Sequence, residues 1–150
     1  MEGNALKKAK EIWEVTKIPC SADDTGLFVD ALNGEPGVYS SRYAGENVTY
    51  ADNRKKLLCN LDGTPLISRT AYFRTVVCYY FEKDKYEFFD GVCEGKIIFD
   101  ERGDNGFGYD AIFLPNGFDK TFAELDFETK NRISHRAKAF ENFKEHLLNQ

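Results

Sequence analysis

The chain begins with apolar positions at helical spacing. Apolar side chains recur every three or four residues from Leu6 to Trp13, which predicts a helix over residues 5–17. Asn4 is a suitable cap for the start of this helix, and Pro19 is expected to end it. The first element is therefore predicted to be an amphipathic helix.

Helical spacing returns twice more. Residues 51–61 are predicted to form a second helix, because Gly63 stands just beyond its expected end. The tail from Phe122 onward is predicted to be helical as well. A break near Ser134 is expected there, because its hydroxyl can cap a final helix that runs to the C-terminus.

The middle of the chain has the composition of strands. Residues 69–81 are rich in Tyr, Phe, Val and Thr, and the polar tip 82–85 separates them from residues 86–90, so a hairpin is expected. Residues 95–99 and 109–115 are predicted to be two further strands. Helices at both ends and strands between them predict an α/β fold, in which helices pack on one sheet.

Two short apolar segments precede this region. Residues 18–22 are predicted to form a buried strand that ends in Asp23-Asp24-Thr25-Gly26. Residues 27–32 follow as a second apolar piece, and the Gly/Pro/Ser-rich segment 33–45 is expected to be an ordered loop.

Length and charge narrow the class of protein. The chain has 150 residues, a hydrophobic content of 42% and an aromatic content of 15%, which fit one folded domain over residues 1–150. No apolar run is long enough for a membrane span or a signal core, so we expect neither export nor a membrane partner. The net charge of −5 argues against a nucleic acid polymer as partner. The four cysteines have no metal-type spacing and are expected to be small, buried apolar residues in a reducing cytoplasm.

Asp23 and Asp24 are the first candidates for chemistry. Carboxylates at the end of a strand lie where sites of α/β folds gather, and Mg²⁺ prefers carboxylate oxygens. Adjacent strand residues point to opposite faces, so one acid can face a cleft while the other supports it. The alternative is a plain turn, for which Asp-Asp-Thr-Gly is equally suitable.

The segment GFGYDAIF, residues 106–113, is the second candidate. Glycine permits a close approach of the backbone to a planar base, and Phe107 or Tyr109 can stack on that base. The alternative is an edge strand, flanked by glycines, whose rings enter the core.

The segment KNRISHR, residues 130–136, is the third candidate. On one continuous helix Lys130 and Arg136 would not share a face, whereas a break at Ser134 lets them converge and directs free N–H groups at an anion. The alternative is a helix with solvated charges. For Lys8, one of several lysines near the N-terminus, the alternative of a surface charge is stronger still.

Taken together, three segments resemble the inosine triphosphate pyrophosphatase family, which is also described as non-standard purine nucleoside triphosphate pyrophosphatases. These segments are ADDTGLFVDALNGEPGVYSSRYAG, GFGYDAIF and KNRISHR, and TFAEL between the last two fits as well. Their order and spacing agree over essentially the whole chain, and three long motifs are far more specific than one short pattern.

The resemblance implies a fold and an activity. The implied fold is a mixed sheet flanked by helices, with a cleft between two lobes. The implied reaction is hydrolysis of ITP, dITP and XTP to the monophosphate and pyrophosphate with Mg²⁺, in a cytoplasmic homodimer.

The resemblance also assigns residues. Asp24 matches the catalytic acid, which accepts a proton and lies at the metal. The positions that match substrate contacts are Lys8, Thr25, Phe107, Gly108, Tyr109, Asp110, Lys130, His135 and Arg136. A water nucleophile suits the absence of an evident serine or cysteine triad. Donors from His135 or Arg136 suit a 6-oxo purine and disfavour adenine.

Two departures from the family pattern stand out. Ala111 replaces the usual proline after GYD, which is expected to loosen the base slot slightly. The family's first strand, with its Ser/Thr-x-Asn-x-x-Lys phosphate loop, has no counterpart before Asn4. We therefore expect a chain that lacks the first strand and helix, with impaired activity. The rival hypotheses are a non-catalytic nucleotide-binding or dimerisation module and a purely structural partner protein.

Overall fold

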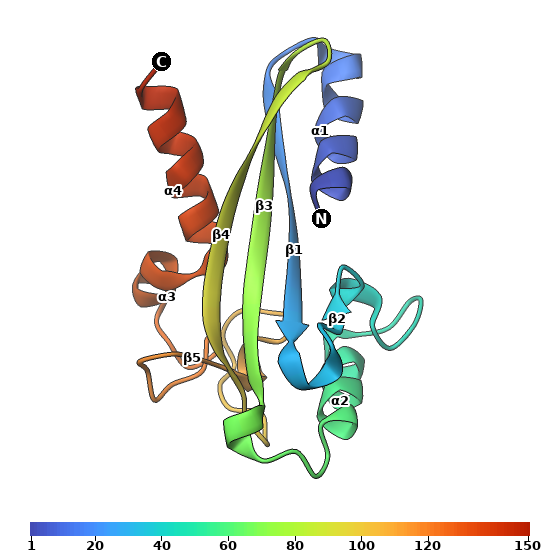
Figure 1. Ribbon diagram of the computed structural model, residues 1–150, viewed down its shortest axis with the longest axis vertical. Coiled ribbons are helices and arrows are strands. Elements are labelled where there is room, and N and C mark those ends of the chain that lie inside the picture. Colours follow the sequence, from blue (N-terminus) through green and yellow to red (C-terminus); the bar gives the residue numbers. More distant parts are fainter.

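The computed structural model describes residues 1–150 and contains one five-stranded sheet flanked by helices (Figure 1). The strand order is β2-β1-β3-β4-β5, and all four pairings are antiparallel. The strands are β1 (Cys20–Val29), β2 (Pro36–Gly37), β3 (Thr70–Glu82), β4 (Lys85–Ile97) and β5 (Phe113–Pro115). The α-helices are α1 (Glu2–Thr16), α2 (Tyr50–Asn60), α3 (Phe127–Ile133) and α4 (His135–Leu148). The predicted α/β fold with a flanked sheet is confirmed, although the resemblance implied a mixed sheet.

Strands β1, β3 and β4 form the long central part of the sheet. The hairpin of β3 and β4 is confirmed, with its tip between Glu82 and Lys85. Strand β4 is one element, whereas the sequence predicted separate strands over 86–90 and 95–99, because Gly91 does not interrupt its pairing with β3.

The prediction that a strand ends at Ala22 is wrong. Strand β1 continues through Asp23 and Asp24 to Val29, since every residue in it pairs with β3. On its other side, β1 pairs only at Leu27 and Phe28 with β2. The two carboxylates therefore lie inside a strand, yet at an edge of the sheet that no other strand of the chain covers.

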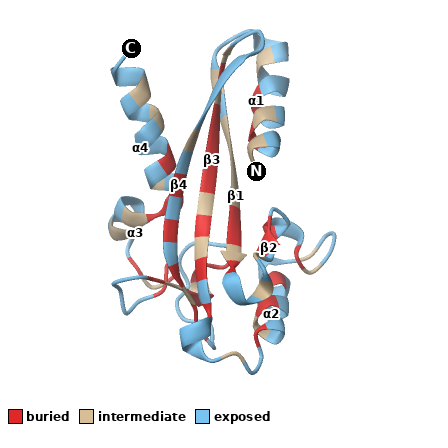
Figure 2. Ribbon diagram, in the orientation of Figure 1, coloured by how far each residue is buried: buried red, intermediate tan, exposed pale blue.

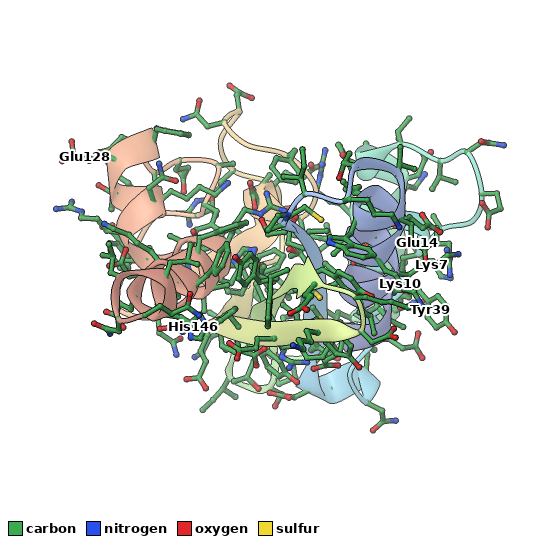
Figure 3. The ribbon with its side chains drawn as sticks, turned by 90° about the horizontal axis from the view of Figure 1, so that it is seen from above. Lys7, Lys10, Glu14, Tyr39, Glu128 and His146 are labelled. Carbon is green, nitrogen blue, oxygen red and sulfur yellow. The ribbon has the colours of Figure 1, made fainter.

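Helices α1 and α4 cover opposite faces of the sheet (Figures 1 and 3). Ala5 and Ala9 of α1 pack on one face in a cluster with Val76, Cys78 and Tyr80. The solvent side of α1 carries Lys7, Lys10 and Glu14, which Figure 3 shows on the outer surface of the helix. The helix begins at Glu2, not after Asn4, so Asn4 does not cap it.

The lower part of the molecule holds the larger core. Fifteen buried residues form one cluster there, which includes Leu27 of β1, Leu57 of α2 and Phe113 of β5. Figure 2 shows this buried region beneath the exposed hairpin tip. Helix α2 begins with a capping box between Thr49 and Asp52, so its first turn has defined hydrogen bonds.

The C-terminal tail folds as two helices separated at Ser134. The predicted break is confirmed: Ser134 has extended backbone, and its hydroxyl accepts a hydrogen bond from the Ala137 N–H. The first turns of the tail differ from the prediction, since α3 starts only at Phe127. Residues 109–115 are also not one strand, because a 3-10 turn over Asp110–Ile112 precedes β5.

A glycine permits the close packing of α4 on the sheet. A Cβ atom on Gly91 of β4 would lie 2.0 Å from the backbone oxygen of His135 and 2.4 Å from the nitrogen of Ala139. The absence of a side chain at this position therefore sets the distance between α4 and β4.

All four cysteines are free, and two of them, Cys78 and Cys93, are buried. Burial raises the pKa of both thiols to about 11. Cys59 is exposed on α2, in contrast to the prediction of a buried cysteine. None of the helices has both the length and the apolar character needed to cross a bilayer.

Candidate active site

A cavity of about 460 Å³ lies on the α4 face of the sheet. Its lining residues come mainly from β1, β3, the start of α2, the loop around residues 107–110, α3 and α4. Eight of the ten residues that the resemblance assigned are among its lining residues: Thr25, Phe107, Gly108, Tyr109, Asp110, Lys130, His135 and Arg136. Three segments that are distant in the sequence therefore meet at one cavity.

The segment GFGYD forms a loop, and its glycines are explained by two different contacts. Gly106 has a φ of 74°, and a Cβ atom there would lie 2.1 Å from the Asp110 carboxylate. Gly108 has a φ of 61°, and no atom lies within 4 Å of the place where a Cβ atom would be. The close neighbour of Gly106 is thus a carboxylate of the same loop, and only Gly108 leaves room for a ligand.

The loop is fixed by hydrogen bonds from its two ends. The Asp110 carboxylate accepts from the Phe107 N–H at 3.0 Å and from Lys130 Nζ at 2.7 Å. The buried Tyr109 hydroxyl donates to the Ser40 carbonyl at 2.7 Å. Burial raises the pKa of Tyr109, so this hydroxyl stays protonated. Asp110 and Tyr109 therefore hold the loop in shape.

Phe107 presents its ring to the cavity. Its side chain is 54% exposed, although it is large and apolar. The Lys130 nitrogen lies 5.5 Å and the Arg136 guanidinium carbon 5.9 Å from its ring centroid. The ring of Tyr50 lies 6.0 Å away, tilted by 43°. An exposed ring beside two cations and a second ring is a suitable platform for a flat, electron-rich heterocycle.

His135 is buried at the wall of the cavity. Its ring stacks on Phe73 at 4.5 Å, and its Nδ1 atom has no hydrogen-bond partner. Burial, followed by the charges of Arg136, Lys130 and Lys138, lowers the pKa of His135 to about 3. The imidazole is therefore neutral at physiological pH, and its buried Nδ1 atom has no hydrogen-bond partner within the protein.

Arg136 connects the cavity with strand β1. Its Nε donates to Asp23 Oδ2 at 3.1 Å, and a second nitrogen lies 3.4 Å from the Thr25 hydroxyl. The Thr25 hydroxyl also shares a hydrogen bond of 2.8 Å with Thr75. Asp23 and Thr25 thus project to the α4 face, as alternation along a strand requires.

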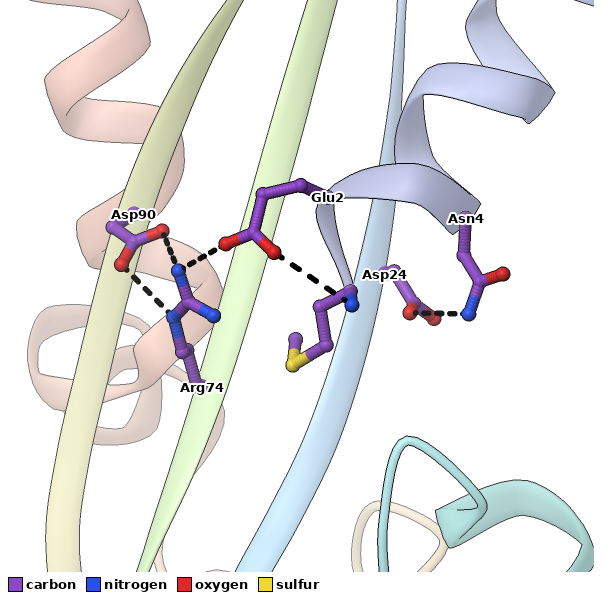
Figure 4. A network of polar contacts seen from close by, with 6 residues as sticks. Glu2, Asn4, Asp24, Arg74 and Asp90 are labelled. Atoms are coloured by element: carbon purple, nitrogen blue, oxygen red, sulfur yellow. Dashed lines mark hydrogen bonds and ion pairs between the residues drawn. The ribbon is translucent and has the colours of Figure 1, made fainter.

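Asp24 and Lys8 lie on the other face. Asp24 Oδ2 accepts from the Asn4 amide at 3.2 Å (Figure 4). Lys8 Nζ lies 3.8 Å from Asp24 Oδ1. Lys8 also donates to the Asp23 carbonyl at 2.9 Å. Neither Asp24 nor Lys8 lines the cavity that holds Phe107 and Arg136. The structure therefore brings eight assigned residues together and places two across the edge strand.

An ionic network ties the start of α1 to the sheet beside Asp24. Arg74 donates to both oxygens of Asp90, at 2.9 and 3.0 Å, and to Glu2 at 2.6 Å (Figure 4). The hydrogen bond from Arg74, followed by a backbone hydrogen bond, lowers the pKa of the Glu2 carboxyl group. This network orients the first turn of α1, which carries Asn4, over Asp24.

The donors for a metal ion are few. No group of three or more histidine, cysteine, aspartate or glutamate side chains is placed to hold a cation. Asp24 offers one carboxylate, and Asp23 points to the opposite face. Such a set does not form a protein-only site, but it fits a cation that keeps its waters and is held mainly by substrate oxygens.

Sequence reasoning missed several lining residues. The aromatic residues Tyr50, Phe127 and Phe140 line the cavity, and so does Ser40. The exposed Phe127, an aromatic residue among polar neighbours at the start of α3, was a usable signal. Tyr50 gave no signal, because its contact with Phe107 spans 57 residues of sequence.

Comparison with known proteins agrees with this geometry. The profile of the Ham1 family matches residues 1–146. A dITP/XTP pyrophosphatase of Thermoanaerobacter pseudethanolicus is 51% identical over 148 residues, which cover 99% of this chain and 74% of that protein. A dITP/XTP pyrophosphatase of Elusimicrobium minutum is 54% identical over 141 residues, which cover 94% of this chain and 72% of that protein.

Solved structures give the same result. The Staphylococcus aureus Ham1 protein superposes with a TM-score of 0.92 at 41% identity, covering 99% of this chain and 76% of that one. A HAM1 protein from Coxiella burnetii also gives 0.92, at 42% identity, covering 98% of this chain and 76% of that one. The fold and the assembled motifs define a nucleotide-hydrolase type of α/β protein, and the chain belongs to the Ham1 family.

Proposed function

We propose that this protein hydrolyses non-standard purine nucleoside triphosphates, namely ITP, dITP and XTP, to the monophosphate and pyrophosphate. The observation that carries the proposal is the convergence of Phe107, His135 and Arg136 on one cavity, with an unpartnered nitrogen on His135. The same substrate class is supported by the names of the relatives, which are dITP/XTP pyrophosphatases with 51% and 54% sequence identity to this chain.

The base is proposed to bind in the cavity on the α4 face. Phe107 offers a ring for stacking, and Gly108 leaves open space beside it. Arg136 is a permanent donor, and the neutral His135 offers a donor in one of its tautomers. Both suit the 6-oxo group of hypoxanthine or xanthine. They leave the amino group of adenine unpaired, which costs about 1–3 kcal/mol per buried polar group.

The phosphates are proposed to cross the open edge of β1. Arg136 and Thr25 lie on the cavity side of this strand, and Lys8 and Asp24 lie on the other. Because at Asp23 and Asp24 β1 pairs with β3 on one side only, and β2 reaches just Leu27 and Phe28 on the other side, an extended triphosphate can pass along this open edge between the two faces. Lys8 would then stabilise the charge of the leaving pyrophosphate.

Mg²⁺ is the proposed cofactor, and Asp24 is the residue that would hold it together with phosphate oxygens and water. When bound, the cation supplies charge neutralisation on the phosphates. The chain's own contribution is the orientation of Asp24 by the Asn4 amide and Lys8. From there Asp24 accepts a proton from the attacking water, a type of help typically worth ~10²–10⁴-fold.

The direct test is pyrophosphate release from ITP, XTP and ATP at matched concentrations with added Mg²⁺. We expect turnover of ITP and XTP well above that of ATP. Turnover of all three at equal rates would contradict the assignment of the base cavity, and absence of any turnover together with binding of IMP would leave a nucleotide-binding module as the function.

A cytoplasmic homodimer is also proposed, following the family resemblance. Four free cysteines fit a reducing compartment. Light scattering during size-exclusion chromatography measures the oligomeric state, and a monomer at micromolar concentration would contradict this part of the proposal.

A further inference from the structure

One hydrogen bond to the loop that carries Phe107 comes from a residue outside the three motifs. Arg54, on α2, donates through one terminal guanidinium nitrogen to the carbonyl oxygen of Gly108 at 2.7 Å. Its Nε atom donates to the carboxylate of Glu101. No other donor contacts the Gly108 carbonyl, so Arg54 alone satisfies this group.

The position of Arg54 on α2 places a second contact beside the first. Tyr50 precedes Arg54 by four residues, so both side chains lie on one face of the helix. The Tyr50 ring contacts the Phe107 ring, with 6.0 Å between centroids. Arg54 donates to the carbonyl of Gly108, the residue that follows Phe107. One turn of α2 therefore contacts both Phe107 and Gly108.

The loop needs such support because none of its other hydrogen bonds includes the Gly108 carbonyl. Asp110 holds the Phe107 N–H, and Tyr109 reaches Ser40. The two glycines, Gly106 and Gly108, have positive φ angles and widen the conformational range of the backbone between these contacts. Without Arg54 the carbonyl of Gly108 would have no partner to fix its direction.

We infer that Arg54, paired with Glu101, is a positioning residue that fixes the Phe107–Gly108 backbone and thereby sets affinity for the purine. The inference rests on the proposed function, because it assumes that the base stacks on Phe107. Arg54 does not line the cavity, so it acts through the loop and not on the substrate. Its planar fork reaches a carbonyl and a carboxylate at once, which the point charge of lysine does less well.

The test compares Arg54→Gln, Arg54→Lys and Glu101→Gln with the 150-residue wild-type chain. Arg102→Gln is the matched control, because Arg102 also bonds one carboxylate, Glu124, and one backbone carbonyl, that of Asp119, but outside this loop. Two quantities are measured: the dissociation constant of IMP by NMR titration, and hydrogen–deuterium exchange of the amides of residues 105–110.

For Arg54→Gln we expect IMP binding to weaken about tenfold, which corresponds to about 1.4 kcal/mol. Inhibition by pyrophosphate, which does not use the base cavity, should stay unchanged. The KM for ITP should rise by a similar factor while kcat changes little, because ground-state and transition-state binding are lost together. Arg54→Lys should recover part of the affinity, and Glu101→Gln should weaken it less than Arg54→Gln.

The exchange measurement keeps the inference separate from the proposed function. Faster exchange of residues 105–110 in Arg54→Gln than in Arg102→Gln supports the positioning role, whether or not IMP is the ligand. Equal exchange in the two variants, or equal affinity for IMP, would overturn it while ITP hydrolysis by the wild type stands. If the wild type binds no IMP, the proposed function fails, and the exchange comparison alone decides what Arg54 does.

Discussion

The two faces of the central sheet differ in how their polar groups are held. On the α4 face, His135, Tyr109 and Asp110 are buried at the cavity and fixed by stacking or hydrogen bonds. On the α1 face, Lys8 is exposed and contacts Asp24 at 3.8 Å from a solvent-facing helix. The base side is thus preorganised by the core, whereas the proposed phosphate side depends on surface groups.

This difference teaches how one strand serves two tasks. Because side chains alternate along β1, Asp23 joins the base side through Arg136 and Asp24 joins the phosphate side through Asn4. Adjacent carboxylates can therefore have separate roles without sharing a site. Substitutions on the two faces should therefore affect base binding and turnover separately.

Asp24→Asn should remove turnover and keep base binding. The amide cannot accept the proton from water, so we expect pyrophosphate release from ITP to fall by ~10²–10⁴-fold. The affinity for IMP should stay within a factor of two, because Asp24 does not line the cavity. Steady-state kinetics and IMP titration measure the two quantities.

Asp23→Asn is the matched variant. It weakens the hold on Arg136 and is expected to lower IMP affinity more than kcat. If both variants lose turnover to the same extent, the two carboxylates do not have separate roles.

Gly91→Ala should destabilise the fold through the α4 face. The new methyl group would meet backbone atoms of His135 and Ala139 at 2.0 and 2.4 Å, so α4 must shift. We expect the free energy of unfolding in urea to fall by about 3 kcal/mol, at the upper end for overpacking.

Gly3→Ala provides the comparison on the α1 face. A methyl group at Gly3 has open space, and alanine favours helix, so a gain of about 0.5–1 kcal/mol is expected. If Gly91→Ala leaves the free energy of unfolding unchanged, α4 does not pack on β4 as closely as described.

His135 should make stability depend on pH. Its pKa is about 3 in the folded state and 6.5 when exposed, so between these values the unfolded chain binds a proton that the folded chain does not. Stability is thus expected to fall with pH below 6.5, by about 1.4 kcal/mol per unit from this group once pH is well below that value. Urea unfolding at pH 7.0, 6.0 and 5.0 measures the slope.

His135→Gln should flatten this slope. His146, the other histidine, lies near the end of α4 and contacts Glu87 at 2.8 Å, so His146→Gln is the matched control. If His146→Gln flattens the slope as much as His135→Gln does, the pH dependence does not come from His135.

The smallest effect is expected at Arg74 on the α1 face. Its ion pairs with Asp90 and Glu2 are partly exposed, with 27% of the Arg74 side chain accessible, so Arg74→Gln should cost about 1 kcal/mol or less. Salt should reduce the difference between the variant and the wild type, since it screens such pairs. A loss that does not respond to salt would indicate packing and not charge.

How far the sequence predicts this protein depends on the range of the interaction. The hairpin of β3 and β4, the break at Ser134 and the helix over α2 follow from local signals, namely runs of aromatic and β-branched residues, a capping hydroxyl and a glycine just beyond the helix end. The motifs also named eight residues that meet at the cavity.

Local patterns gave the wrong result where pairing with a distant segment decides. Asp23 and Asp24 look like a turn, yet ten consecutive pairs with β3 hold them in a strand. Likewise, residues 109–115 look like a strand, but the backbone turns first, where Tyr109 donates to the Ser40 carbonyl and Lys130 donates to Asp110. In both cases contacts with remote residues outweigh the local preference.

The sequence by itself determined the family, the α/β class and the residues of the three motifs, because these depend on residue type and order along the chain. Only the tertiary structure decided that Asp23 and Asp24 serve opposite faces and that Arg54 of α2 holds the Gly108 carbonyl. The physical reason is that the face of a strand residue depends on register, and a hydrogen bond between residues 54 apart depends on how the elements pack; neither is encoded in any short stretch of sequence.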